Sequence, residues 1–152
     1  MINKFDGEYR WLSNFWPVVV ELDGVRYGSV EHAYQAAKSL DPIYRAKLAA
    51  LPSDAAKMAK RIGHSAKLRP DWNAVRFVVM LDLLRQKFLD PDLSRKLQET
   101  GNRELVEGNW WHDVVWGKCT CKRKGHVNEG ANRLGLMLME IRKSLCGVTP
   151  QV

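Results

Sequence analysis

The sequence predicts an α+β fold: a predominantly helical single domain with a small N-terminal β-hairpin and short strands. Apolar residues recur at helical spacing over residues 72–89 and 131–145. Cap and stop residues, such as Ser, Asp–Pro and Gly, bound several shorter segments. Asp23–Gly24 between two apolar runs is a strong two-residue hairpin signal. We expect one domain over residues 1–152, a length that suits a single core.

The N-terminal half is expected to contain the hairpin and three helices. Ser29 is a good N-cap, and Asp41 with Pro42 supplies a cap and a first helical residue. Gly63 is a stop signal. The expected elements are strands 16–22 and 25–27 and helices 30–40, 42–50 and 52–63. The residues before the hairpin have no clear period and suit a folded loop.

The C-terminal half is expected to contain two core helices and one short helix. The longest, over residues 72–89, carries many apolar side chains, and the last, over 131–145, has one apolar stripe. A short helix from Asp90–Pro91 to Thr100–Gly101 and a strand over 105–107 lie between them. Residues 108–130 have little periodicity and an unusual composition.

The chain carries a net charge of +7 and has a pI of about 9.5. A basic surplus favours acidic partners: nucleic acid, nucleotides or phosphorylated metabolites. The densest basic group, Lys118 with Lys122 to Lys124, also suits a solvated loop. No apolar run is long enough for a membrane span, and the N-terminus does not resemble a signal peptide. We therefore expect a cytoplasmic protein without membrane contact.

Three cysteines, Cys119, Cys121 and Cys146, do not suggest a disulfide framework, which fits a reducing compartment. Cys119 and Cys121 followed by His126 form a conceivable zinc half-site. Its spacing is irregular and a fourth ligand is not evident. We therefore predict no metal site.

A helical stretch over residues 31–38 is the most informative part of the chain. Glu31, Gln35 and Lys38 recur at i, i+4 and i+7, which places them on one stripe beside an apolar face. Polar groups at the edge of a buried face indicate a cleft with shifted pKa values. The alternative is a surface ladder that stabilises the helix by a few tenths of a kcal/mol for each pair.

Residues 107–117 hold three of the six tryptophans beside a Glu, a His and Asp113. These tryptophans either pack into a core or form a flat wall for a ring-shaped ligand. Arg10, Trp11, Ser13 and Asn14 combine a charge, a ring and two short polar groups. Those four suit a phosphorylated sugar, or else a hydrogen-bonded turn.

The last helix opens with a run of small and amide residues. These are Asn128, Gly130, Asn132 and Gly135. Backbone N–H groups at such a helix start are able to hold an anion. The alternative is ordinary capping with close helix packing.

Six motifs occur together in one order: residues 10–15, 29–38, 87–88, 105–107, 111–117 and 132–142. In this order they resemble the NADAR superfamily, named for NAD and ADP-ribose and also called YbiA-like, over about residues 3–145. The resemblance implies an N-glycosidase that hydrolyses the bond between ribose C1′ and an amine or base. One branch of the family removes ADP-ribose from guanine bases of nucleic acid. Another acts on phosphoribosylamino-pyrimidine intermediates of riboflavin biosynthesis.

The resemblance also implies roles for particular residues. The family's glutamate matches Glu31, its helix lysine matches Lys38, and its Trp–Asp element matches the stretch from Trp111 to Asp113, with Trp116 as the alternative tryptophan. We assign Glu31 to proton transfer, and Lys38 to nucleophilic attack or to charge pairing with Glu31.

Asp113 would hold a ribose hydroxyl or act as a second carboxylate. Trp111 or Trp116 would stack on the base and Arg10 would hold phosphate. The remaining substrate-binding candidates are Trp11, Ser13, Asn14, Gln35 and Asn132.

We predict hydrolysis of ADP-ribosylated guanine or a related compound derived from ADP-ribose or NAD, without a cofactor. The first alternative is the riboflavin intermediate. A protein that binds ADP-ribose or NAD without cleaving it is an alternative of another class. A nucleic-acid-binding domain is a third, although no helix shows the dense Lys/Arg face that groove binding prefers. The expected partner is a ribosylated or ADP-ribosylated small molecule or nucleic-acid base.

Overall fold

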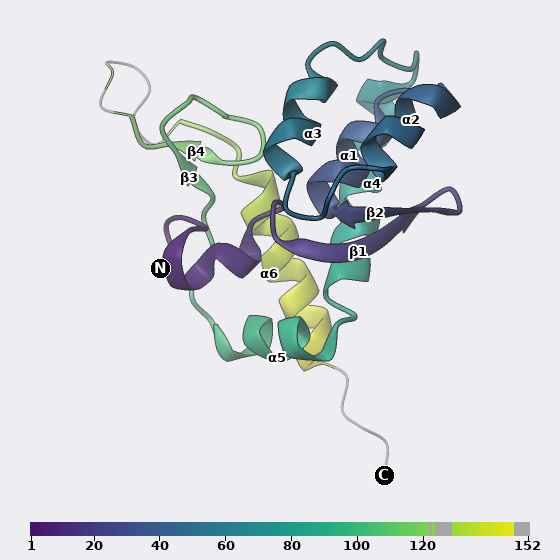
Figure 1. The fold of residues 1–152 in the computed structure, drawn as a ribbon. Helices are drawn as coiled ribbons and strands as arrows, with labels where there is room; N and C mark the ends of the chain where they lie inside the picture. The colour runs from purple at the N-terminus through teal and green to yellow at the C-terminus, as the bar shows by residue number, and fades with distance from the viewer. Residues whose placement is uncertain (122, 124–128, 148–152) are drawn as a thin grey trace. The chain divides into compact units, whose positions relative to one another are not determined.

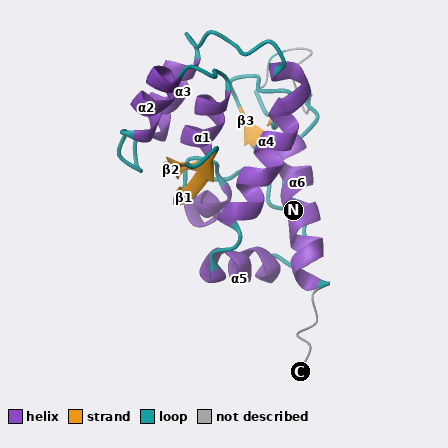
Figure 2. Cartoon of the chain, turned by 90° about the vertical axis from the view of Figure 1, so that its right-hand side faces the viewer, coloured by secondary structure: helices purple, strands orange, loops and turns teal. Residues whose placement is uncertain are grey.

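The computed structural model describes residues 1–121, 123 and 129–147 and divides the chain into two compact units. Unit 1 combines Met1–Ser13 with the chain from Pro91 onward, and unit 2 is Asn14–Asp90. Figure 1 follows the elements along the chain, and Figure 2 shows that helices dominate over strands. The α+β fold class is confirmed, whereas the single domain over 1–152 stays a prediction. No helix within the described ranges has the length and apolarity to cross a bilayer.

The hairpin of unit 2 forms where the sequence predicts it. Strand β1 (Pro17–Leu22) pairs antiparallel with β2 (Val25–Ser29). Asp23 and Gly24 both have positive φ, 49° and 81°, as a tight two-residue hairpin turn requires. Strand β2 runs to Ser29, two residues further than expected, so the hairpin leads directly into the next helix.

Helix α1 (Val30–Ala37) is the central element of unit 2, because it contacts both strands and the three other helices of the unit (Figure 1). The Ser29 hydroxyl caps its start by accepting a hydrogen bond from the His32 N–H. All eight of its residues are buried. The other helices of unit 2 are α2 (Pro42–Ala49), α3 (Ala56–Gly63) and α4 (Trp72–Lys87).

Unit 1 is built around α6 (Arg133–Cys146), against which α5 (Pro91–Glu99) packs. A buried arginine of α6, Arg142, donates to the Thr100 hydroxyl and to the Arg103 carbonyl and so fixes the chain after α5. The remaining elements are the 3-10 helix η1 (Gly7–Leu12) and the parallel two-residue strands β3 (Gly108–Asn109) and β4 (Lys118–Cys119).

Several predicted boundaries in unit 2 are wrong, and hydrogen bonds beyond the helix end explain that of α1. Helix α1 ends at Ala37 instead of residue 40, because the next carbonyls turn outward to other donors. The Lys38 carbonyl accepts from the Arg69 N–H at 2.7 Å, and the Ser39 carbonyl accepts from Arg45 Nε at 2.7 Å. Helix α3 begins at Ala56 instead of residue 52.

In unit 1 the strand predicted over 105–107 is wrong. Leu105 makes only an isolated bridge with Ile2, and the strands lie further along, at β3 and β4. Those strands fall in the segment for which no regular structure was expected, and η1 was also missed. Such short elements depend on pairing partners distant in the sequence and leave no periodic signal.

Candidate active site

The polar stripe of α1 is buried rather than on the surface. Glu31 is 7% exposed and Gln35 is 4% exposed. The Gln35 side-chain amide donates from Nε2 to Glu31 Oε1 across 2.8 Å. The alternative of a surface ladder is therefore wrong. Because burying a carboxylate is costly, its retention on this helix indicates a role beyond helix stability.

Helix α3 holds Gln35 in place against Glu31. A Cβ atom added at Gly63, the last residue of α3, would collide with the Gln35 side-chain oxygen. The amide therefore packs directly on the backbone of Gly63. Within the part of the chain that the structure describes, Gln35 Oε1 accepts no hydrogen bond. The hydrogen bond that this amide donates to Glu31 therefore orients the Glu31 carboxylate.

Lys38 continues the stripe as the C-cap residue of α1 and is half-buried. Burial lowers the pKa of its amine from the ordinary value of 10.5. The Glu31 charge opposes this shift, whereas the positive charge of Lys60 on α3 adds to it. A lysine in this environment has a larger neutral fraction than a surface lysine, as a nucleophilic amine needs.

Asn14 fixes the start of the helix on which Glu31 lies. Its carbonyl accepts from the Glu31 N–H at 3.1 Å, and its side-chain amide contacts Met80 Sδ at 3.5 Å. Asn14 is 8% exposed, and its Oδ1 lacks a hydrogen-bond partner among the described residues. Asn14 thus contacts Glu31 through its backbone, within unit 2.

His32, next to Glu31, has a structural environment. It is fully buried between the Ser29 hydroxyl, 2.6 Å from Nδ1, and the Pro52 carbonyl, 3.0 Å from Nε2. Because a carbonyl only accepts, Nε2 carries the proton and Nδ1 accepts from Ser29. Burial lowers the pKa of His32. The neutral ring therefore anchors the start of α1 to the turn before α3.

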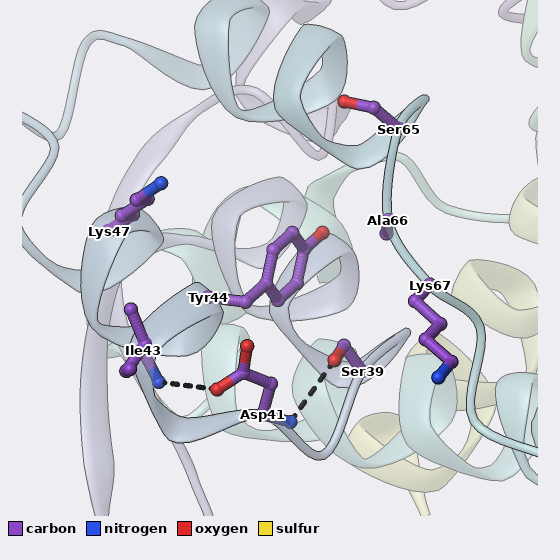
Figure 3. A pocket seen from close by; sticks show the side chains of 8 residues that line it. All are labelled: Ser39, Asp41, Ile43, Tyr44, Lys47, Ser65, Ala66 and Lys67. Atoms are coloured by element: carbon purple, nitrogen blue, oxygen red, sulfur yellow. Dashed lines mark hydrogen bonds between the residues drawn. The ribbon is translucent and has the colours of Figure 1, made fainter.

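A shallow pocket of about 290 Å³ borders the C-terminal end of α1 (Figure 3). It lies between the start of α2 and the loop after α3. Tyr44 in this pocket donates its hydroxyl to the Gln35 carbonyl at 2.8 Å, and burial raises the pKa of Tyr44 to about 12. Asp41 accepts from the Ile43 N–H and donates its own N–H to the Ser39 hydroxyl. The residues that line this pocket hold the end of α1 and the start of α2. Glu31 and Lys38 are not among them.

The predicted phosphate-sugar group divides between the two units. Arg10 and Trp11 lie on η1 of unit 1, and Ser13 caps its end by donating its N–H to the Arg10 carbonyl at 3.0 Å. Arg10 is exposed, as an anion-binding side chain needs to be, whereas Trp11 is only 7% exposed. Asn14 is the first residue of unit 2. The substrate contacts of these residues stay predictions.

Asp113 organises the loop between β3 and β4. Its Oδ1 accepts from the N–H groups of Val115 and Trp116 at 3.1 and 2.9 Å. Asn109 holds the same turn from both sides, since Oδ1 accepts from the Asp113 N–H and Nδ2 donates to the Asp113 carbonyl. The preceding residue, His112, has a φ of 64°, which is uncommon for a residue with a side chain. This turn thus fixes Asp113 and Trp116 together.

The tryptophans of this loop do not fill a core. Trp110 is 75% exposed and Trp111 is 51% exposed, and their rings meet edge to face with centroids 5.7 Å apart. Trp116 is half-buried. Core packing is therefore wrong for Trp110 and Trp111. Stacking on a base by Trp111 or Trp116 stays a prediction.

Asn132 lies at the start of α6 with both side-chain atoms engaged internally. Its Oδ1 accepts from the Glu107 N–H at 3.1 Å and its Nδ2 donates to the Leu105 carbonyl at 3.0 Å. The N–H groups of residues 131–134 donate to the carbonyls of residues 114–117. An anion site at this helix start is therefore wrong, because the loop already occupies the donors. Asn132 supports the loop that carries Asp113, and its contact with substrate stays a prediction.

The zinc half-site lies partly outside the described residues, since His126 is not described. Asn128, predicted for the start of the last helix, also lies outside them. Within the described part of the chain, no group of three His, Cys, Asp or Glu side chains is placed to hold a metal ion. Cys119 and Cys121 are free thiols whose sulfur atoms lie 2.9 Å apart.

Sequence reasoning missed the residues that support the predicted ones. Lys60 changes the charge around Lys38, and Gly63 gives the Gln35 amide its space. Gly63 was interpreted only as a helix stop. Asn109 was also missed, although an Asn four residues before Asp113 is a turn-forming residue. Their importance depends on tertiary contacts that no local pattern encodes.

Comparisons with known proteins show the family of this chain. Residues 2–146 match the family model described as NADAR domain. The chain is 38% identical over 143 residues to N-glycosidase YbiA of Escherichia coli strain K12, covering 91% of this chain and 82% of that protein. The solution NMR structure of the E. coli protein YbiA superposes with a TM-score of 0.77 at 33% identity, covering 96% of this chain and 87% of that one.

A plant protein is also similar. The chain is 32% identical over 154 residues to the chloroplastic riboflavin biosynthesis protein PYRR of Zea mays. The match covers 91% of this chain but 24% of the maize protein.

Proposed function

Because this chain belongs to the NADAR domain family and is an N-glycosyl hydrolase like the YbiA enzymes, we propose that it removes ADP-ribose from guanine bases. The bond cleaved would be the one between ribose C1′ and the base nitrogen. The proposal assigns the proton transfer to Glu31 and the second active group to Lys38. The observation that carries it is the buried Glu31–Gln35 pair beside an amine of lowered pKa.

Breaking an N-glycosidic bond builds positive charge on the sugar and requires a proton on the departing nitrogen. A carboxyl group held by one amide, as Glu31 is held by Gln35, is in a defined position for that proton transfer. Its carboxylate form would also stabilise positive charge at C1′. Proton transfer of this kind contributes roughly 10²–10⁴-fold to rate.

The Lys38 amine offers a covalent route. Its neutral form would attack C1′ as the base leaves, and ring opening would give an imine that water hydrolyses. Burial favours this neutral form by lowering the pKa. A borohydride-trapped adduct on Lys38 would support the covalent route. If substrate is turned over but borohydride traps nothing, Lys38 acts through its charge.

A net charge of +7 supports an anionic substrate carried by nucleic acid. Two exposed tryptophan rings in the Asp113 loop provide flat surfaces of the kind on which bases stack. Arg10 is exposed and would bind phosphate. Asp113 would hold a ribose hydroxyl through the carboxylate oxygen that the turn does not use.

The second candidate is a phosphoribosylamino-pyrimidine of riboflavin biosynthesis. The name of the maize relative favours it. Both substrates contain a ribose, an anionic group and a flat ring, so the same Glu31 and Lys38 chemistry would serve. A protein that binds ADP-ribose or NAD without cleavage uses no proton transfer and would not need the buried carboxylate.

Mass spectrometry of the products distinguishes these candidates. The protein would be incubated in parallel with ADP-ribosylated guanosine, an ADP-ribosylated oligonucleotide and the phosphoribosylamino-pyrimidine. We expect release of ADP-ribose together with unmodified guanosine or unmodified oligonucleotide. Cleavage of the pyrimidine substrate alone would favour the second candidate, and unchanged recovery of all three would contradict both hydrolase proposals.

A further inference from the structure

The free thiols Cys119 and Cys121 lie in the segment that follows the Asp113 loop, and the glycosidase chemistry does not use them. Cys119 is fully buried at the end of β4, whereas Cys121 is half-buried. Residues i and i+2 of an extended segment project to the same side, which brings the two thiols together. Their sulfur atoms lie 2.9 Å apart, with the Cys119 thiol directed at Cys121.

We propose that Cys119 and Cys121 are a thiol pair that hydroperoxides oxidise to a reversible disulfide, and that this disulfide alters the Asp113 loop. Cys121 is the thiol that reacts first, because it is the more exposed of the two. The two thiols are not residues of the proposed glycosidase centre, although the loop that they would alter carries Asp113. Oxidation of the pair does not depend on the identity of the substrate.

The electrostatic environment of Cys121 also favours its reaction before Cys119. The hydrogen bond from Cys119 lowers the pKa of the Cys121 thiol, and the Arg123 backbone and charge lower it further. A lowered pKa increases the fraction of thiolate, the form that reacts with peroxides.

The reaction balances with a hydroperoxide as the oxidant. The Cys121 sulfur attacks the terminal oxygen, the O–O bond breaks, and an alcohol leaves with the thiol proton, giving a sulfenic acid. The Cys119 sulfur then attacks the Cys121 sulfur. An S–S bond forms, the S–O bond breaks, and hydroxide leaves as water with the Cys119 proton. The two thiols lose two electrons, and the hydroperoxide is reduced to an alcohol and water.

A disulfide at this spacing would draw the backbone together. Two residues of an extended segment lie about 6.6 Å apart between Cα atoms, near the upper end of the range that disulfides adopt. Closing the bond therefore tends to contract residues 119–121.

Hydrogen bonds connect this segment to the Asp113 turn. The Thr120 N–H and hydroxyl both donate to the Asn109 carbonyl, at 2.5 and 3.0 Å. Asn109 in turn holds Asp113 through its side chain, and Asp113 holds the Trp116 N–H. A contraction at Thr120 consequently displaces Asn109 and the turn that carries Asp113 and Trp116.

The test treats the reduced full-length protein with a small excess of hydrogen peroxide, then alkylates free thiols and maps the peptides. We expect a mass loss of about 2 Da, the two thiol hydrogens, in a peptide with a Cys119–Cys121 bond, reversed by dithiothreitol. Cys121→Ser and Cys119→Ala should each abolish it. Cys146→Ser, at an exposed cysteine of α6, should leave it unchanged.

Hydrogen exchange of residues 109–116 tests the effect on the loop. We expect faster exchange in the oxidised wild type and in oxidised Cys146→Ser, but no change in peroxide-treated Cys121→Ser. The proposal that a disulfide forms would be contradicted if all three thiols remained open to alkylation. Direct oxidation of Cys121 to the sulfinic acid would also contradict it. A disulfide that left exchange of the loop unchanged would overturn the coupling.

Discussion

At the scale of single residues, Glu31 is held by hydrogen bonds to its side chain and to its backbone. Gln35 donates to its carboxylate, and the Asn14 carbonyl accepts from its backbone N–H. Both contacts lie within unit 2, and each fixes a different part of the residue. Lys38 lies one turn beyond Gln35, and its pKa is lowered by burial, raised by the Glu31 charge and lowered by the Lys60 charge.

Substitution of Lys38 by Arg or Met distinguishes a nucleophile from a charge partner of Glu31. Lys38→Arg keeps the positive charge but has no accessible neutral form, whereas Lys38→Met removes the charge. If Lys38 is the nucleophile, both variants should lose at least about 10²-fold in the rate of cleavage. Single-turnover kinetics against pH would measure this.

In the wild type the rate should rise with pH through a pKa below 10.5, because the neutral amine attacks. Activity of Lys38→Arg close to that of the wild type would contradict a nucleophilic role and leave Lys38 as a charge partner of Glu31.

At the scale of elements, α1 is positioned by close approach to α3. Alanine in place of a helical glycine ordinarily stabilises a helix by about 0.5–1 kcal/mol. At Gly63 it would instead collide with the Gln35 amide. We expect Gly63→Ala to lower the free energy of unfolding by about 1–3 kcal/mol and to reduce activity by displacing the Gln35 side chain.

Urea unfolding and steady-state kinetics measure those two effects. Gly63→Ala with Gln35→Ala should recover stability without recovering activity, because the collision is gone but the hydrogen bond to Glu31 is also lost. Gly147→Ala, where a Cβ meets only ordinary contacts, is the matched control. Full activity of Gly63→Ala would show that Gln35 does not position Glu31.

The anchor at the start of α1 should make stability depend on pH. Burial lowers the pKa of His32 below its ordinary 6.5, so the unfolded chain binds this proton more readily than the folded chain. The His32 contribution is complete above about pH 6.5 and decreases as pH falls through the folded pKa. Unfolding measured between about pH 7 and pH 5 should show this slope.

Two substitutions identify the source of that slope. His32→Asn should flatten it, whereas His64→Asn, at an exposed histidine, should not. An unchanged slope in His32→Asn would assign the pH dependence to other groups.

The elements that the sequence predicted correctly are those with local signals. Asp23–Gly24 determined the hairpin turn, Ser29 and Asp41 capped their helices, and the apolar stripe after Asn132 marked α6. Short strands and η1 were missed because they depend on distant partners.

The candidate site was also predicted only as far as local sequence signals reach. Helical spacing was sufficient to group Glu31, Gln35 and Lys38. It did not predict their burial, nor the contributions of Gly63 and Lys60, which come from α3.

At the scale of the whole molecule, the net charge of +7 makes a prediction about the substrate. Binding to nucleic acid releases counterions, so its affinity falls steeply with salt. If the substrate is an ADP-ribosylated nucleic acid, kcat/KM on an oligonucleotide should fall by at least about tenfold between about 50 and 200 mM salt. On ADP-ribosylated guanosine the decrease should be much smaller. Equal salt dependence on the two substrates would argue against contact with the nucleic-acid backbone.

The central claim is that the buried Glu31 carboxyl performs proton transfer in N-glycosidic cleavage. Glu31→Gln keeps the shape of the side chain and removes its ability to transfer a proton. The most direct test compares its kcat/KM on ADP-ribosylated guanosine with that of Glu21→Gln, the same change at an exposed residue of strand β1. We expect a decrease of about 10²–10⁴-fold for Glu31→Gln and none for Glu21→Gln. A folded Glu31→Gln protein with the activity of the wild type would contradict it.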